Sequence, residues 1–399
     1  MHAAATVLQK CLSSVTDSMH AFRVSALLMA VQCLLSCRRL VLMDLARACP
    51  GEERVRAPLK RLDRLLSNRH LAEEREAFYA QMMRWLICHP NPLILIDWSD
   101  LHGDCRWQLL RAAIPLQGRA FTVLEMVFPE SMKGSPRAQQ QFLHRLRALL
   151  PAQVRPILVT DAGFCAPWLR LVTKFGWYYV GRLRGRTCLC IGEGSWLPNK
   201  QLHSQICGAA RRIEDAQIGK RMPWRLDLVL YRKPGRQRVC VSVRTGRESR
   251  ANTSLKAQRR ESEPWILVTS PQLRHLSAAQ IVSIYSKRMQ IEQSFRDLKC
   301  HRFGCAFAHS LTRDPKRIAI LLLIHALATF AAWLAALSIT AAARVQYGAV
   351  MSQSRLLYSR LRIGWEALRR NDAECTSHAL HATFNHPPQE FHTWLEVPA

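Results

Sequence analysis

Acidic residues are scarce in this chain of 399 residues. It has 29 Asp and Glu against 57 Lys and Arg, which gives a formal net charge of +28 at pH 7. An enzyme of small neutral metabolites gains nothing from such self-repulsion, whereas a protein that neutralises many phosphates gains affinity through counterion release. The charge therefore points to nucleic acid as the partner, ahead of an anionic membrane surface.

The chain also lacks a paired cysteine framework, low-complexity tracts and a secretion signal. Its 14 cysteines follow no paired spacing, and Cys33-x3-Cys37 and Cys188-x-Cys190 stand alone, so we expect neither a disulfide scaffold nor structural zinc. Asp17 interrupts the apolar N-terminus, which argues against a signal peptide. With 49% hydrophobic residues, we expect a folded, cytoplasmic protein with reduced thiols.

One stretch lacks charge altogether. No Asp, Glu, Lys or Arg occurs from Ile318 to Ala343, and this length would suffice to cross a bilayer. Alanine is its commonest residue, however, and His325, Thr329 and Ser338 are interspersed. A single helix of this kind among basic segments is more often the core helix of a large protein. We therefore expect no membrane partner.

Residues 1–90 are predicted to form a helical domain with basic faces. Apolar residues recur at helical spacing in 24–35 and 59–66, and Pro50-Gly51 breaks the pattern. Cations cover the polar faces: Arg38, Arg39, Arg47, Arg54, Arg56, Lys60, Arg61, Arg64 and Arg69. A DNA-binding domain, of the helix-turn-helix type, fits this pattern. A solvated basic surface is the alternative.

From Pro92 the pattern becomes that of a mixed α/β sheet. Residues 93–96 and 156–160 are short apolar runs typical of buried strands, and they end at Asp97 and Asp161. Between and after them we predict strands at 106–116, 120–128 and 177–180 and helices at 136–150 and 168–174. Because α/β sheets place ligands at the carboxyl ends of strands, both aspartates are candidate site residues.

Residues 182–260 have a different composition. They contain 19 Lys or Arg against five Asp or Glu, with β-like runs at 226–231 and 239–243 between turn signals. This pattern predicts a basic, β-rich insertion. The α/β pattern then resumes with a strand at 265–269 and one long helix over 278–299.

That helix carries the most informative spacing in the chain. On a continuous helix, four polar side chains fall within an arc of about 60°: Tyr285, Arg288, Glu292 and Lys299. By itself such a face would be a solvated stripe of ion pairs.

Together with Asp97 and Asp161, Glu292 completes a set of hard oxygen ligands. Such a set suits Mg²⁺ or Mn²⁺ rather than zinc, and two such ions can support in-line displacement at a phosphodiester. Asp100 and Glu125 are weaker candidates, because neither ends a predicted buried strand.

These segments resemble a known family. LILIDWSD, ILVTDAGF and YSKRMQIEQSFRDLK resemble the DDE transposases of bacterial insertion sequences, specifically the insertion-sequence-four family, whose helix motif is Tyr-x2-Arg-x3-Glu-x6-Lys. The resemblance runs from about Arg23 to about Arg369. It is nearest to the insertion-sequence-ten group, which shares the N-terminal KRLDRLLSNRHL.

The resemblance implies an RNase H-like catalytic domain made of residues 91–183 and 263–310. The basic β insertion, 184–262, interrupts it, and a helical C-terminal region, 311–399, follows. It also implies that Asp97, Asp161 and Glu292 are the catalytic triad and bind two Mg²⁺ or Mn²⁺ ions per site.

DNA contacts follow from the same resemblance. Tyr285, Arg288 and Lys299 would hold phosphates near the cleaved end. Trp265 would accommodate a base flipped out during hairpin formation, although a Trp opening an apolar strand is also a common core residue. Some members have a second Trp at the position of Met289. Met289 would stack on the flipped base more weakly than a Trp, or contact it through its thioether.

The activity implied is cut-and-paste transposition by a homodimer on double-stranded DNA. Two alternatives stay open: an RNase H-like, structure-specific DNA nuclease, and a non-catalytic DNA-binding regulator derived from a transposase.

Overall fold

The chain is a mixed α/β protein. The computed structural model describes residues 3–51, 54–185, 187–233, 248, 251–252, 254–255, 263–347, 350–352, 355–356 and 358–396. Its contacts divide it into two compact units, the first made of residues 1–156 and 288–397 and the second of Ile157–Lys287.

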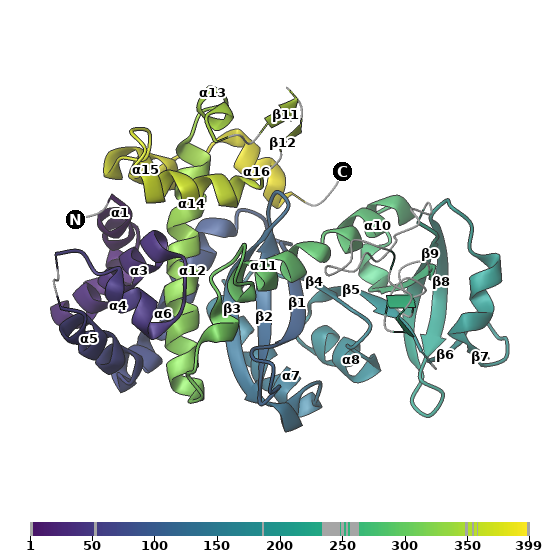
Figure 1. Cartoon of the computed structure of the whole chain (residues 1–399). Coiled ribbons are helices and arrows are strands. Elements are labelled where there is room, and N and C mark those ends of the chain that lie inside the picture. The colour runs from purple at the N-terminus through teal and green to yellow at the C-terminus, as the bar shows by residue number, and fades with distance from the viewer. Residues whose placement is uncertain are drawn as a thin grey trace. The chain divides into compact units, whose positions relative to one another are not determined.

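The first unit begins with a run of helices, as the apolar spacing predicts. They are α1 (Ala3–Cys11), α2 (Ser13–Thr16), α3 (Ala21–Cys37), α4 (Leu42–Arg47), α5 (Arg56–Leu66) and α6 (Arg69–Leu86) (Figure 1). Polar side chains begin two of them: His20 accepts the Phe22 N–H at α3, and the Asn68 side chain accepts the Leu71 N–H at α6. Helix α3 ends at Cys37, and its C-cap residue, Arg38, has a left-handed φ of 54°.

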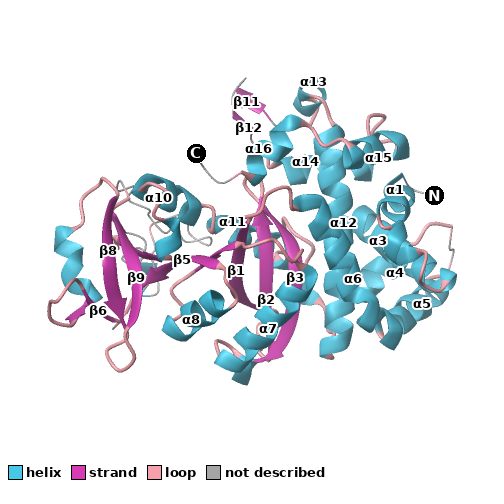
Figure 2. Ribbon diagram, turned by 180° about the vertical axis from the view of Figure 1, so that it is seen from behind, coloured by secondary structure: helices cyan, strands magenta, loops and turns pink. Residues whose placement is uncertain are grey.

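Three antiparallel strands follow in this unit (Figure 2). They are β1 (Leu93–Asp100), β2 (Trp107–Pro115) and β3 (Ala120–Pro129), with β2 in the middle. Helix α7 (Pro136–Leu149) starts at the Ser135 cap, and α11 (Met289–Lys299) contacts all three strands. The register places Asp97, Arg111 and Glu125 in one row across the sheet, so their side chains leave the same face.

Helix α12 (Pro315–Ser338) forms the core of the first unit. Within the described residues it is the one helix long and apolar enough to cross a membrane, yet 94% of its most apolar window is buried. It contacts α3, α6, β3 and α14 (Arg360–Arg370). A Cβ at Gly364 would lie 1.9 Å from the Ala332 carbonyl oxygen, so only glycine permits this approach of α14 to α12. The uncharged stretch is therefore a core helix, as the sequence predicts.

The remaining C-terminal elements are short. They are α13 (Ala341–Val345), a hairpin of β11 (Val350–Ser352) and β12 (Arg355–Leu356), α15 (Ser377–Asn385) and α16 (Gln389–Leu395).

The second unit contains a run of seven neighbouring strands in a mixed sheet. Its order is β4 (Ile157–Thr160), β5 (Tyr178–Leu183), β10 (Trp265–Thr269), β9 (Trp224–Tyr231), β8 (Arg211–Ile218), β6 (Cys188–Cys190) and β7 (Leu197–Pro198). Strands β4 and β5 are parallel and joined by α8 (Ala166–Lys174), and the other pairs are antiparallel. The strand predicted at 239–243 lies outside the described residues.

Two predictions about local structure are wrong. The long helix is two helices, α10 (Ala278–Ser286) and α11, because Lys287 and Ile291 donate to carbonyl oxygens three residues back, at Ile284 and Arg288, and the i to i−4 ladder is interrupted. The 60° arc is therefore not a property of one helix. Asp97 also lies inside β1 rather than at its end, because pairing with β2 continues to Asp100 after the apolar run has stopped.

Candidate active site

In the first unit, Arg288 bridges two of the predicted catalytic carboxylates. Its Nη1 lies 3.4 Å from Asp97 Oδ2, and its Nη2 lies 2.6 Å from Glu292 Oε1. The side chain of Glu292 is 39% exposed and that of Asp97 is 13% exposed. Two half-buried acids thus share one cation, which reduces the repulsion that would otherwise oppose their proximity.

Local structure explains how the two acids meet. Asp97 is the residue at which β1 changes from buried to half-buried, and its Oδ1 accepts the Trp98 N–H at 2.8 Å. Glu292 is in the first turn of α11, where the helix dipole favours a negative charge. Arg288 is the N-cap residue of the same helix, so helix α11 supplies both the acid and its cation.

Asp161 belongs to the second unit and follows β4 directly, as predicted. Its Oδ1 accepts the backbone N–H of Gly163 at 2.8 Å. A Cβ at Gly163 would lie 3.0 Å from that same oxygen. A side chain at position 163 would therefore crowd the carboxylate, which a glycine leaves in place.

Lys299 ends α11 and contacts the strand that carries Asp97. Its Nζ donates to Ser99 Oγ at 2.7 Å and to the Asp100 carbonyl oxygen at 2.9 Å. Burial lowers the pKa of its ammonium below the usual value, and the nearby Asp100 acts in the opposite direction. The side chain thus connects the C-terminal end of α11 to the last residues of β1.

The other three predicted DNA contacts lie in different surroundings. Tyr285 is on α10, where its buried ring meets the half-buried ring of Trp265 edge-on, at a centroid distance of 4.9 Å. Trp265 also contacts Tyr231, at 5.8 Å. Met289, in the first unit, is exposed, and Arg288 Nη2 lies 3.5 Å from its sulfur.

The first unit also contains a buried network that the sequence patterns do not predict. Arg111 and Glu125 are 0% exposed, and Arg111 Nε donates to Glu125 Oε1 at 2.7 Å. Arg111 Nη1 also donates to Ser294 Oγ on α11, and Tyr79 OH donates to Glu125 Oε2, both at 2.9 Å. A charged residue inside each of two apolar strands was the signal for this pair. Of the two weaker metal-ligand candidates, Glu125 binds Arg111 and Asp100 binds Lys133.

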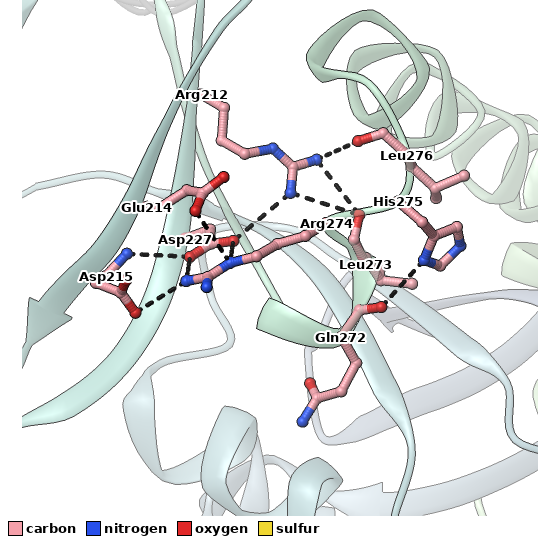
Figure 3. A network of polar contacts seen from close by, with 9 residues as sticks. All are labelled: Arg212, Glu214, Asp215, Asp227, Gln272, Leu273, Arg274, His275 and Leu276. Atoms are coloured by element: carbon pink, nitrogen blue, oxygen red, sulfur yellow. Dashed lines mark hydrogen bonds and ion pairs between the residues drawn. The ribbon is translucent and has the colours of Figure 1, made fainter.

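A second network organises the second unit (Figure 3). Asp227 on β9 is fully buried, and Arg274 donates to both of its carboxylate oxygens, at 2.7 and 2.8 Å. Asp227 Oδ1 also accepts the N–H of Asp215, which has a φ of 54° in an irregular stretch of β8. Arg274 precedes α10, so this contact fixes the segment that leads to Tyr285 against β8 and β9.

Acids whose oxygens could bind a metal lie in both units: Asp97 and Glu292 in the first and Asp161 in the second. Within the described ranges, no group of three or more His, Cys, Asp or Glu is arranged as a metal cluster. The donor chemistry nevertheless fits a hard divalent cation, because both Asp97 and Glu292 offer carboxylate oxygens that already share a positive partner.

Comparisons with known proteins identify the family. Residues 89–330, more than half of the chain, match the family described as the transposase DDE domain, whose members generally use divalent metals. No curated protein matches the chain. A piggyBac transposase, solved by cryo-EM as a synaptic complex with hairpin DNA, is similar at 11% identity and a TM-score of 0.45, over 96% of this chain and 79% of that one. The chain belongs to the DDE transposase family of enzymes, which cleave DNA and transfer its strands.

Proposed function

We propose that this protein is a cut-and-paste transposase of the insertion-sequence-four family, in the insertion-sequence-ten group. Asp97, Asp161 and Glu292 are its catalytic residues, in an RNase H-like domain of residues 91–183 and 263–310. The observation that carries this proposal is the bridge from Arg288 to Asp97 and Glu292. It joins the first acid of the motif to the third across 195 positions of sequence, from residue 97 to residue 292.

The three carboxylates would hold two Mg²⁺ or Mn²⁺ ions, which supply Lewis-acid activation of the attacking oxygen and stabilise the leaving oxygen. The chain's own cations perform the other tasks. Arg288 orients the two carboxylates of the first unit and brings a positive charge to the place where a phosphate reacts. Lys299 fixes the end of α11 on β1 and contacts a DNA phosphate when the end is bound.

The reaction consists of successive phosphodiester exchanges. Water cleaves one strand at the element end and leaves a 3′-OH, which attacks the opposite strand to form a hairpin. A second water opens the hairpin, and the 3′-OH then attacks target DNA. Each exchange breaks one phosphoester bond and forms another, or consumes one water, so no ATP is required.

Two basic regions fit DNA. The N-terminal helices form a groove of about 540 Å³ between α3 and α5, and its walls include Arg23, Lys60, Arg61 and Arg64. Phe22, at its edge, is 83% exposed. This groove supports binding of the element ends by residues 1–90. The basic insertion, 184–262, supports a second contact with the same DNA. Trp265 and Met289 would contact a flipped base, and a homodimer would pair the two ends in the cytoplasm.

The test uses the full chain, a duplex that carries the element end, and Mg²⁺. We expect nicked DNA first and then hairpin-ended DNA on a denaturing gel. Joining of a precleaved end to target DNA distinguishes a transposase from a structure-specific nuclease, which would cut but not join. Specific end binding with no cleavage would instead identify a regulator and contradict the proposal.

A further inference from the structure

A cavity of about 310 Å³ lies in the first unit, bounded by α11, α12, α14 and the start of β3. This volume is at the lower end of the range for small-molecule sites, about 300 to 1,000 Å³. Its described lining includes none of the three proposed catalytic acids and none of Tyr285, Arg288, Lys299, Trp265 and Met289. The cavity is therefore a separate feature that the catalytic proposal does not explain.

The walls of the cavity carry an excess of positive charge. Arg38, Arg119, Arg296 and Arg362 line it. Two acids pair with three of these cations: Asp297 lies 2.6 Å from Arg119, and Glu366 lies 3.2 Å from Arg38 and 2.8 Å from Arg362. Because four guanidinium groups but only one carboxylate, that of Asp297, stand on the described lining, the walls favour an anion, and the planar guanidinium matches phosphate oxygens.

Aromatic rings lie on the same lining. Phe303 is 64% exposed and Tyr358 is 46% exposed. Trp365 is buried beside them, and the Arg38 guanidinium lies 5.6 Å from the centre of its ring. Exposed rings next to cations are the surfaces on which nucleobases stack.

Helix α12 contributes neutral polar groups. Thr329 is 8% exposed, and its Oγ1 has no hydrogen-bond partner within the described part of the chain. His325 lies one turn earlier on α12, and burial lowers its pKa to about 3, so its imidazole is neutral at pH 7. A buried hydroxyl without a partner is costly, and a ligand with a polar edge would satisfy it.

We propose that this cavity binds a nucleotide, with its phosphate at the guanidinium groups, its base against the exposed rings, and a polar edge of the base at Thr329. Inorganic phosphate would use only the cations, and an apolar ligand would leave them unused. The nucleotide has two possible sources: an unpaired nucleotide of bound DNA, or a free nucleotide. The site does not depend on the catalytic proposal.

Cys300, on the lining of the cavity, provides a chemical reporter. Partial burial acts to raise the pKa of its thiol, but the backbone N–H groups of Phe303, Arg302 and Gly304 lower it below the usual value. We therefore expect N-ethylmaleimide to alkylate it readily near neutral pH. Peptide mass spectrometry distinguishes alkylation of this thiol from alkylation of Cys207, an exposed cysteine of the second unit.

The experiment titrates the full chain with dAMP, deoxyadenosine and inorganic phosphate by calorimetry. We expect dAMP to bind more tightly than either fragment, and to slow alkylation of Cys300 but not of Cys207. Thr329→Val removes the hydroxyl at nearly constant volume and should weaken dAMP binding by about three- to tenfold. The matched control is Thr383→Val on α15, whose hydroxyl bonds to the Ala379 carbonyl oxygen, and it should bind dAMP as the wild type does.

A single-stranded oligonucleotide distinguishes the two sources. If the oligonucleotide protects Cys300 from alkylation and this protection is weaker in Thr329→Val, bound DNA is the source of the nucleotide. If only dAMP protects Cys300, the ligand is a free nucleotide. The proposal is overturned if neither probe protects Cys300, if phosphate binds as tightly as dAMP, or if Thr329→Val binds the protecting probe as tightly as the wild type.

Discussion

Arg111 and Glu125 form a fully buried ion pair on neighbouring strands of the first unit. Arg111 is also the cross-strand neighbour of Asp97, and its Nη1 reaches Ser294, two residues after Glu292 on α11. The pair thus connects the sheet that carries one candidate carboxylate to the helix that carries the other. Its role is to position these elements, since neither residue is exposed to substrate.

Removal of one member of this pair should be severely destabilising. Arg111→Met leaves the Glu125 carboxylate buried without its guanidinium, which costs about 3 to 5 kcal/mol. The measurement is the urea midpoint of the full chain. Arg145→Ala provides a surface control, because Arg145 is 59% exposed and lies 3.4 Å from Glu76, and such pairs contribute about 0 to 1 kcal/mol.

The double variant Arg111→Met, Glu125→Leu isolates the cause. Because it removes both charges together, it should recover much of the stability that the single variant loses. A double variant as unstable as Arg111→Met would show that lost packing, rather than a stranded charge, causes the effect.

Gly163 should be needed for the geometry of Asp161. In Gly163→Ala the new methyl group would press on Asp161 Oδ1 at 3.0 Å, so we expect slower cleavage with little change in thermal stability. Gly208→Ala is the control in the same unit, because a Cβ there meets nothing within 4 Å. Equal cleavage rates for the two variants would contradict the account of Asp161.

Asp227 should make stability depend on acid pH. Burial by itself raises the pKa of this carboxyl, but hydrogen bonds from Arg274 and the Asp215 N–H lower it below the usual value. A carboxyl with a lowered pKa stabilises the fold above its unfolded pKa of about 3.9, and this contribution is lost as the pH falls through the folded pKa.

Arg274→Ala should therefore lower the urea midpoint at pH 7. The difference in urea midpoint between the variant and the wild type should shrink as the pH falls below about 4. Protonation of Asp227 then removes from the wild type the stabilising ion pair that the variant already lacks. Urea titrations at pH 7 and pH 3 measure this change. A constant difference between the two proteins across this range would exclude Asp227 as its source.

Lys299 should contact a phosphate when DNA is bound. Lys299→Ala should weaken binding of the element end and reduce the slope of log K against log salt concentration by about 0.9, the value for one phosphate on duplex DNA. The measurement is fluorescence anisotropy over a series of salt concentrations. An unchanged slope would show that Lys299 contacts no DNA phosphate and serves only its hydrogen bonds to Ser99 and Asp100.

Local patterns predicted most of the elements that carry the candidate site. The apolar run before Asp161 ends where β4 ends, because burial of that strand continues to its last residue, Thr160. The run before Asp97 stops earlier than the strand. Hydrogen bonding to β2 sustains β1 through half-buried residues, and a one-dimensional apolar pattern does not contain that information.

The break between α10 and α11 was not predictable for a similar reason. Lys287 and Arg288 keep right-handed helical angles, and no proline or glycine marks the interruption. Arg111 and Glu125 were visible as charges inside apolar strands, but their pairing depends on the β2–β3 register. The features that the sequence did not predict therefore depend on pairing between distant strands rather than on local propensity.

The most direct test of the catalytic proposal measures cleavage of a labelled element-end duplex in Mg²⁺ by Asp97→Asn, Asp161→Asn and Glu292→Gln. Asp100→Asn is the matched control, because Asp100 is on the same strand as Asp97 and pairs with Lys133 at the surface. We expect each of the first three variants to bind the end without cleaving it, while Asp100→Asn cleaves as the wild type does. Cleavage at the wild-type rate by any of the three would contradict the catalytic proposal.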